Sequence, residues 1–411
     1  MAEIRPFYCV RPAEELAERV AALPYDVYNR QEAKREVERE PLSFLKIDRA
    51  ETSFDDSVDT YAPEVYQKAK ELLEKDVVDG VYITDEDRAY YIYQLVMEGR
   101  SQTGLVACSS VDDYVNQVIK KHENTRADKE VDRITHVDTC SAQTGPIFLA
   151  YRSQDAINKV VDKYLQTPAL YDFTAVDGVA HRVWKISEKA DVDAVYRAFQ
   201  GIDRIYIADG HHRAASAVKV GLKRREETPD YTGEEEFNYF LSVLFPHDEL
   251  MIMDYNRTVK DLNGLTPDEF MAKVAGIFEV EPSDSPVAPD KKGVFGMYIG
   301  GKWYRLTAPG SLFEGKDAVE SLDVSVLQEQ LLGPVLGIGD PRTDSRIDFI
   351  GGIRGLKELE RRADGDMCIS FSMYPTSIDE LFDVADNGLL MPPKSTWFEP
   401  KLRSGLFIHK I

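Results

Sequence analysis

The sequence predicts an α+β fold in which mixed sheets are flanked by helices. Short runs of β-branched and aromatic residues alternate with segments whose apolar residues have helical spacing. Several neighbouring strands are separated by only a few turn residues, which is typical of hairpins. With 411 residues, of which 43% are hydrophobic, the chain is long enough for two or three domains with real cores.

The first third of the chain supplies helices and strands in alternation. Charge pairs at i,i+4 favour a solvated helix over 29–40, and apolar spacing predicts an amphipathic helix over 61–77. β-branched and aromatic content predicts the strands. In order, we expect a strand over 4–10, a helix over 12–22, the helix over 29–40, a strand over 43–48, the helix over 61–77, and strands over 80–84, 89–97 and 103–111.

The segment "IYIADGHHRAASAVKV", residues 205–220, reads as a strand that turns directly into a helix. The strand covers 204–208, and alanine-rich helical spacing begins at Ala214. The polar turn Asp209-Gly210-His211-His212-Arg213 separates the two. The strands over 147–151 and 181–187 and the helix over 190–199 come before it.

This turn has the residues of a phosphate site. Amide groups in the first turn of a helix favour an anion, and Gly210 leaves room for close approach. Arg213 can hold two phosphate oxygens, while His211 and His212 add donors that carry charge near pH 7. Asp209 either caps the helix or binds a magnesium ion. The alternative is a structural cap with histidines bonded to nearby backbone. A zinc site is less favoured, because adjacent helical histidines point about 100° apart.

The segment 122–133, "HENTRADKEVDR", is the second candidate. Phosphoryl transfer needs cations for the phosphate and a carboxylate that holds magnesium or accepts a proton. A solvated helix with internal ion pairs explains the same composition, and on composition alone we favour it. The candidates are Glu123 and Glu130 as catalytic carboxylates, and Arg126, Lys129 and Arg133 as phosphate ligands.

Two further segments carry weaker signals. Asn256 and Arg257 follow at the end of a strand over 250–259, where they suit an anionic or carboxylate substrate, although a lone arginine is more often a surface residue. In "MPPKST", Lys394 could contact a phosphate or form a Schiff base with a pyridoxal cofactor, but an ordered loop is the favoured interpretation.

The last third predicts a lobe of its own. Capping-box patterns at Thr266 and Ser377 predict helices, and Gly300-Gly301 predicts a hairpin turn. We therefore expect a mixed α/β domain over 1–262 that contains the DGHHR core, and a C-terminal α+β lobe over 263–411. The elements expected in the lobe are helices over 266–278, 323–338 and 376–388 and a hairpin over 293–308.

Charge and cysteine usage exclude some classes of function. A net charge of −22 argues against a general nucleic-acid binder, which needs clustered lysine and arginine. The four cysteines have no zinc spacing, so we expect reduced thiols in a cytoplasmic protein. No apolar run resembles a signal peptide or a membrane span.

Several long blocks resemble the domain-of-unknown-function 1015 family, whose name assigns no activity. The resemblance covers nearly the whole chain. The blocks are "IRPFYCVRP", "PYDVY", "SFLKID", "TGLVACSSVDDY", "IKKHENTRADKEVDR", "AQTGPIFLAY", "IADGHHRAASA", "LMIMDYNR" and "MPPKSTWFEPKLRSGL".

Around 200–220, the DGHHR block also resembles the phosphate-binding turn of the ParB/sulfiredoxin-like superfamily, whose members bind ATP or CTP and include kinases for free L-serine. The resemblance implies that Gly210, His211, His212 and Arg213 contact nucleotide phosphates. It also implies that Asp209 lies near the reacting phosphate or its magnesium. In the serine kinases a glutamate is the base, and the motif does not assign its equivalent in this chain.

Three functions are open at this point. The first is an ATP- and Mg²⁺-dependent kinase for a small hydroxyl metabolite, for which free L-serine is the first substrate to test. The second is a nucleotide-binding regulatory protein or slow NTPase without transfer. The third is a sulfiredoxin-like thiol repair enzyme, for which Cys140 is the only candidate. For each, the expected partners are small molecules, with a homo-oligomer as a further expectation.

Overall fold

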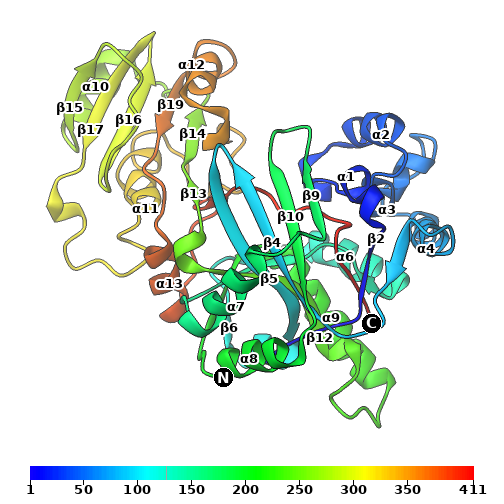
Figure 1. The fold of residues 1–411 in the computed structure, drawn as a ribbon. Helices are drawn as coiled ribbons and strands as arrows, with labels where there is room; N and C mark the ends of the chain where they lie inside the picture. The colour runs from blue at the N-terminus through cyan, green and yellow to red at the C-terminus, as the bar shows by residue number, and fades with distance from the viewer. Residues whose placement is uncertain (126) are drawn as a thin grey trace. The chain divides into compact units, whose positions relative to one another are not determined.

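The computed structural model describes the backbone of every residue but 126 and every side chain outside 126–129. It divides into two compact units, Met1–Leu250 with Pro400–Ile411, and Met251–Glu399. Each unit contains both sheets and helices, so the predicted α+β class is confirmed (Figure 1).

The border between the units differs from the predicted one at 262. Strand β14 (Tyr255–Val259) pairs with β18 (Ile347–Gly351) and β19 (Ile369–Ser372) of the second unit. Strand β21 (Ile408–Lys410) returns to pair with β2 (Cys9–Pro12) in the first unit. These pairings join segments far apart in the sequence, which local patterns do not report.

The central element of the first unit is a nine-stranded mixed sheet. Most neighbours are antiparallel, but β11 pairs in parallel with β6, and β12 in parallel with β8. In spatial order its strands are β6 (Ile119–Lys120), β11 (Ile205–Asp209), β8 (Ile147–Tyr151), β12 (Tyr239–Pro246), β5 (Arg100–Ser110), β4 (Tyr90–Met97), β10 (Ala180–Ile186) and β9 (Tyr171–Thr174), and β1 (Ile4–Arg5) also pairs with β5.

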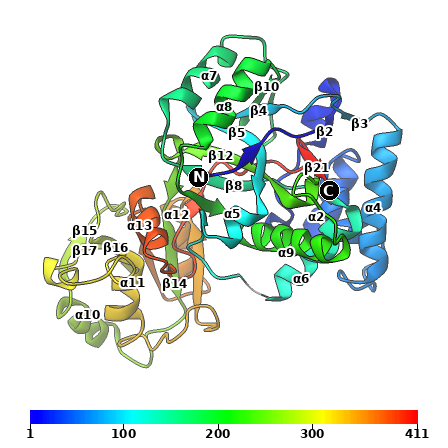
Figure 2. The ribbon, with the colours of Figure 1, turned by 90° about the horizontal axis from the view of Figure 1, so that it is seen from below.

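Helices bury their apolar faces against this sheet. Helices α7 (Asp155–Leu165) and α8 (Lys189–Phe199) pack together, and α9 (His211–Glu227) contacts both α5 (Val111–Val115) and α6 (Ala127–Cys140) (Figure 2). Side chains of α7, α8 and α9 share one buried cluster with the strands. Removal of this apolar surface from water is the main stabilising term of the unit.

A second buried cluster holds the N-terminal helices of the same unit. Residues 43–48, predicted as a strand, are instead mostly the helix α3 (Leu45–Asp48). Phe44, Leu45 and Ile47 are all fully buried, and a short apolar run does not by itself separate a buried strand from a buried helix. The other elements here are a four-stranded sheet of β3 (Tyr82–Thr84), β2, β21 and β7 (Ala142–Gln143), with helices α1 (Ala17–Val20), α2 (Arg30–Arg39) and α4 (Pro63–Val78).

The second unit is built on a six-stranded antiparallel sheet. Thr266 and Ser377 both form the predicted capping boxes at the starts of α10 and α13. The sheet has the order β15 (Glu279–Ser283), β17 (Lys302–Thr307), β16 (Val294–Ile299), β19, β14 and β18; the helices are α10 (Pro267–Ala275), α11 (Asp323–Leu327), α12 (Leu356–Asp364) and α13 (Ile378–Asp386), and β13 (Ile252–Met253) pairs with β20 (Trp397–Phe398).

A buried carboxyl group begins helix α11. Both oxygens of Asp323 accept from the Gly293 N–H at 3.0 Å. Burial nevertheless raises the pKa of Asp323 to about 7. Between about pH 4 and pH 7, the folded protein therefore keeps the Asp323 carboxyl protonated, whereas the unfolded chain, with an ordinary aspartate pKa near 4, has released that proton.

This difference predicts a stability that depends on pH. A raised folded-state pKa means that stability is fully present below about pH 4 and is lost as pH rises through about 7. We expect Asp323→Asn to raise the melting temperature at about pH 8 more than at about pH 5. Thermal unfolding followed by circular dichroism measures the melting temperature at both pH values. The control is Asp284→Asn, a change at an exposed aspartate. Equal effects of Asp323→Asn at both pH values would contradict the prediction.

Candidate active site

The DGHHR block forms the strand–glycine–helix turn that its sequence predicts. β11 ends at Asp209, Gly210 is the N-cap residue, and α9 begins at His211. Gly210 has a φ of 91°, and a Cβ there would lie 3.1 Å from two nitrogens of the Arg213 guanidinium. Both the left-handed backbone and the close guanidinium therefore require glycine. No side chain caps the helix, so an anion has access to first-turn amides.

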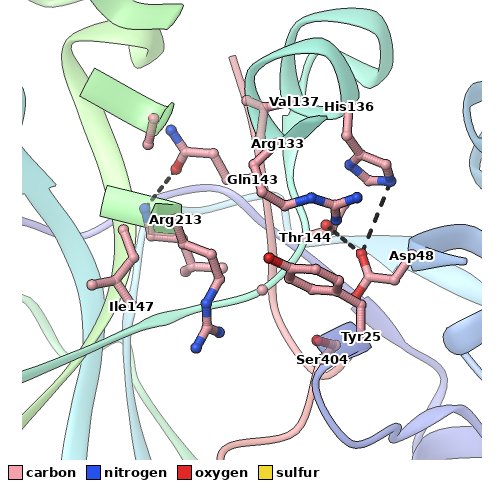
Figure 3. Close-up of a pocket in the computed structure, with 13 residues that line it drawn as sticks. Tyr25, Asp48, Arg133, His136, Val137, Gln143, Thr144, Ile147, Arg213 and Ser404 are labelled. Atoms are coloured by element: carbon pink, nitrogen blue, oxygen red, sulfur yellow. Dashed lines mark hydrogen bonds and ion pairs between the residues drawn. The ribbon is translucent and has the colours of Figure 1, made fainter. Parts of the chain in front are cut away.

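Arg213 lines a small cavity in the first unit (Figure 3). Its Nη1 donates to the Pro146 carbonyl at 2.7 Å, and it forms no ion pair with any carboxylate side chain that the structure describes. The cavity volume is about 30 Å³, room for one or two waters. The cavity is lined by Tyr25, Asp48, Arg133, His136, Val137, Gln143, Thr144, Gly145, Ile147, Arg213, Ala217, Leu241 and Ser404.

A second guanidinium lines the same cavity from helix α6. Arg133 lies over the Tyr25 ring, with its Cζ 4.0 Å from the ring centroid, and its Nε donates to Asp132 at 2.9 Å. Figure 3 shows Arg133 and Tyr25 on one side of the cavity and Arg213 on the other. The structure thus brings together two arginines that the sequence analysis assigned to separate segments.

Asp48 is the one carboxylate among the described lining residues, and the sequence analysis missed it. Its Oδ1 accepts from the Thr144 hydroxyl at 3.0 Å and lies 4.0 Å from Nε2 of His136. Burial and the nearby Arg133 lower the pKa of His136, so this imidazole is neutral and donates to the Ile47 carbonyl. Asp48 falls in the segment predicted as a strand, and no motif marked it.

Asp209, the last residue of β11, is held as an anion directly before Gly210. Its Oδ1 accepts from the Gly210 N–H at 2.8 Å, and its Oδ2 accepts from Lys401 at 3.1 Å. Burial acts to raise the pKa of Asp209, but the charges of Lys401 and Arg213 outweigh burial and hold it well below its usual range. Lys401 comes from the C-terminal segment, where the sequence analysis had singled out Lys394 instead.

The two histidines of the turn have different surroundings. His211 is buried, and its ring packs edge to face against His122 with centroids 4.5 Å apart. Burial lowers the pKa of both rings, that of His122 to about 4, so His211 does not use the capacity for charge near pH 7 that its residue type offers. His212 is half-buried.

The charged segment after residue 121 largely joins two helices. Glu130 is buried and accepts from Thr125 and from Lys219 of α9, so it does not line the cavity. Lys223 and Arg224 of α9 bond to Asp138 of α6 in the same way. Composition favoured a solvated helix with internal ion pairs, whereas these pairs join α6 to α9, and Glu130, Asp132 and Arg133 are buried. Arg126 lies outside the described residues, as does the side chain of Lys129, and Glu123 is half-buried.

Asn256 and Arg257 belong to the second unit, on β14. The Asn256 amide oxygen accepts from the Met373 N–H at 2.9 Å. Arg257 is buried and donates to the carbonyls of Tyr255 and Lys394. These bonds join backbone segments within the unit, and a substrate role for Asn256 and Arg257 stays a prediction.

The cysteines bear on the sulfiredoxin-like hypothesis, and the length and apolar content of the helices bear on a membrane span. All four cysteines are free, and burial raises the pKa of Cys140 to about 12. A thiol this weakly acidic is a poor nucleophile, which argues against the sulfiredoxin-like hypothesis. Within the described residues, no helix has the length and apolar character to cross a membrane.

Comparison with known proteins gives low-identity structural likenesses. The chain is similar to free serine kinase in complex with AMP (15% identity, TM-score 0.34, covering 74% of this chain and 92% of the other). It is also similar to SbnI with C-terminal truncation from Staphylococcus aureus (12%, 0.37, 73% and 85%) and to a conserved hypothetical protein from Pyrococcus furiosus (15%, 0.33, 76% and 96%).

No curated protein matches the chain. A family model does, over residues 4–325, which is most of the sequence. This agrees with the resemblance carried by the blocks from "IRPFYCVRP" onward. The chain therefore belongs to the family described as Protein of unknown function (DUF1015).

Proposed function

We propose that this protein binds a nucleoside triphosphate at the DGHHR turn and transfers its terminal phosphoryl group to a small hydroxyl compound. One observation carries the proposal. Arg213 and Arg133, from two different helices, line one cavity that also contains the carboxylate of Asp48. Two cations and one base are the inventory that phosphoryl transfer requires.

The surroundings of Arg213 support a phosphate ligand. A buried or half-buried guanidinium normally finds a carboxylate, whereas among the described residues Arg213 donates a hydrogen bond to the Pro146 carbonyl. The uncapped amides of α9 begin within the same turn. Because the cavity has room for only one or two waters, the side chains that line it must move to admit a phosphate.

In the proposed reaction, Asp48 accepts the proton of the substrate hydroxyl. The hydroxyl oxygen then forms a bond to the terminal phosphorus, and the bond from that phosphorus to the nucleoside diphosphate breaks. Arg213 and Arg133 neutralise charge on the phosphoryl oxygens. Asp209 is ionised and offers an oxygen ligand of the kind that magnesium prefers, and magnesium would draw charge from the phosphates.

Glu123 is a second candidate for the base, because it lies close to the turn. A carboxylate oxygen of Glu123 lies within 4.8 Å of one ring nitrogen of His122 and one ring nitrogen of His211. Asp48 is preferred because it lines the cavity with both arginines, whereas Glu123 does not. Free L-serine remains the first substrate to test, and transfer to it is part of the proposal.

Removal of the guanidinium of Arg213 should weaken nucleotide binding. We expect Arg213→Ala to lose ~1.5–3 kcal/mol of ATP binding free energy, the value of a charged hydrogen bond. Calorimetry with ATP and magnesium measures it. Arg225→Ala is the matched control, since Arg225 lies on the same helix and pairs with Asp112. Unchanged affinity in Arg213→Ala would refute the phosphate role.

Neutralising Asp48 should separate binding from chemistry. We expect Asp48→Asn to bind ATP with nearly unchanged affinity and to lower the transfer rate by about 10²–10⁴-fold, the usual contribution of a general base. Labelled ATP is incubated with amino acids and sugars, serine first, and phosphorylated product is counted. Glu123→Gln and Glu130→Gln are assayed beside it.

The same assay decides between the two remaining functions. Product that disappears with Asp48→Asn supports the kinase and its base. Product that persists in Asp48→Asn but disappears in Glu123→Gln moves the base to Glu123. If ATP binds or is slowly hydrolysed, but no compound in the panel is phosphorylated, the protein is a nucleotide-binding regulator and the transfer proposal is abandoned.

A further inference from the structure

A cluster of metal-ligating side chains lies beside the DGHHR turn. His122, Glu123 and His211 each offer one ligand atom, and the three atoms lie within 4.8 Å of one another. Two are imidazole nitrogens and one is a carboxylate oxygen. This donor set suits first-row divalent ions, and zinc in particular.

The topology of the sheet explains why residues 122 and 211 meet. β6 pairs in parallel with β11, with Ile119 opposite Ile205 and Lys120 opposite Tyr206. Parallel neighbours end at the same edge of a sheet, so the residues that follow each strand emerge together. His122 follows β6 by two residues, and His211 follows β11 by two residues.

The contacts of His122 leave one ring nitrogen without a partner. Its side chain is 2% exposed, and its Nδ1 makes no hydrogen bond. Native structures rarely leave a buried ring nitrogen in this state. The nearest aromatic neighbour is the His211 ring, set edge to face at 85°. The only bond between the two residues is a long one, from the His122 N–H to Nε2 of His211 at 3.5 Å.

We propose that His122, Glu123 and His211 together bind a divalent transition-metal ion such as zinc, with a further coordination position open to water. Metal–ligand bonds of about 2.0–2.2 Å place tetrahedral donors about 3.4 Å apart. The three groups therefore draw together on binding. Glu123 is half-buried and lies between β6 and α6, outside regular structure.

Two carboxylates offset the positive groups of the neighbourhood. Glu123 supplies one negative charge within the cluster, and Asp209 acts on both imidazoles, while Lys121 and His212 act on His211 in the opposite sense. Three protein ligands and an open position are the usual arrangement of a catalytic rather than a structural zinc site. This site uses neither Arg213 nor Asp48, but it shares His211 with the DGHHR turn, so the metal titration is made without nucleotide to separate it from the proposed phosphoryl transfer.

The test is a titration of the full-length, tag-free chain with Co²⁺ after treatment with a chelator and without nucleotide. We expect one Co²⁺ per chain, visible absorption bands of a low-coordinate site, and loss of those bands when Zn²⁺ is added. His122→Ala, His211→Ala and Glu123→Gln should each weaken Co²⁺ binding at least about tenfold.

Two controls keep the result clear. His247→Ala removes a histidine of the same unit that lies outside the cluster and should bind Co²⁺ as the wild type does. Circular dichroism melting identifies variants that do not fold, and if both histidine variants fail, the half-buried Glu123→Gln decides. The proposal is overturned if the wild type binds neither Co²⁺ nor Zn²⁺ at millimolar metal, or if folded variants of the cluster bind as tightly as His247→Ala.

Discussion

The candidate site depends on the packing of the Arg213 guanidinium against the bare backbone of Gly210. The turn at Gly210 has a left-handed backbone, and a Cβ would meet the guanidinium at 3.1 Å. Gly145 approaches the same side chain from the other side, where a Cβ would lie 3.5 Å from Nη1. The absence of a side chain at both glycines therefore leaves the space that the Arg213 side chain occupies.

Charge balance around the turn distinguishes structural from functional cations. Arg133 is next to Asp132, Lys401 is next to Asp209, and Lys219 is next to Glu130. The buried members of these pairs are tolerated because each has a counter-charge, while Lys219 itself is exposed. Arg213 differs in its contacts, since its hydrogen bond goes to the neutral Pro146 carbonyl and it forms no ion pair with a described carboxylate, although its charge acts on Asp209. This surplus of donors supports the proposed anionic ligand.

Sequence patterns succeeded where the deciding interactions are local. The capping boxes at Thr266 and Ser377, the Gly300-Gly301 hairpin and the strand–glycine–helix turn all depend on residues within a few positions of one another. They failed where burial decides. Residues 45–48 are helical because they pack among other N-terminal helices, and His211 is neutral because the His122 ring and the protein interior surround it.

The sequence by itself determined the α+β class and the abrupt turn at 209–211, and it singled out Gly210 and Arg213 as the residues of the proposed phosphate site. Each follows from backbone freedom, helix propensity or side-chain chemistry at a single place in the chain. Only the tertiary structure decided which distant groups share that place: Asp48 and Arg133 in the cavity, Lys401 at Asp209, and His122 beside His211. The physical reason is that strand pairing and helix packing bring these residues together across as many as 192 positions of sequence, and no local pattern encodes such a pairing.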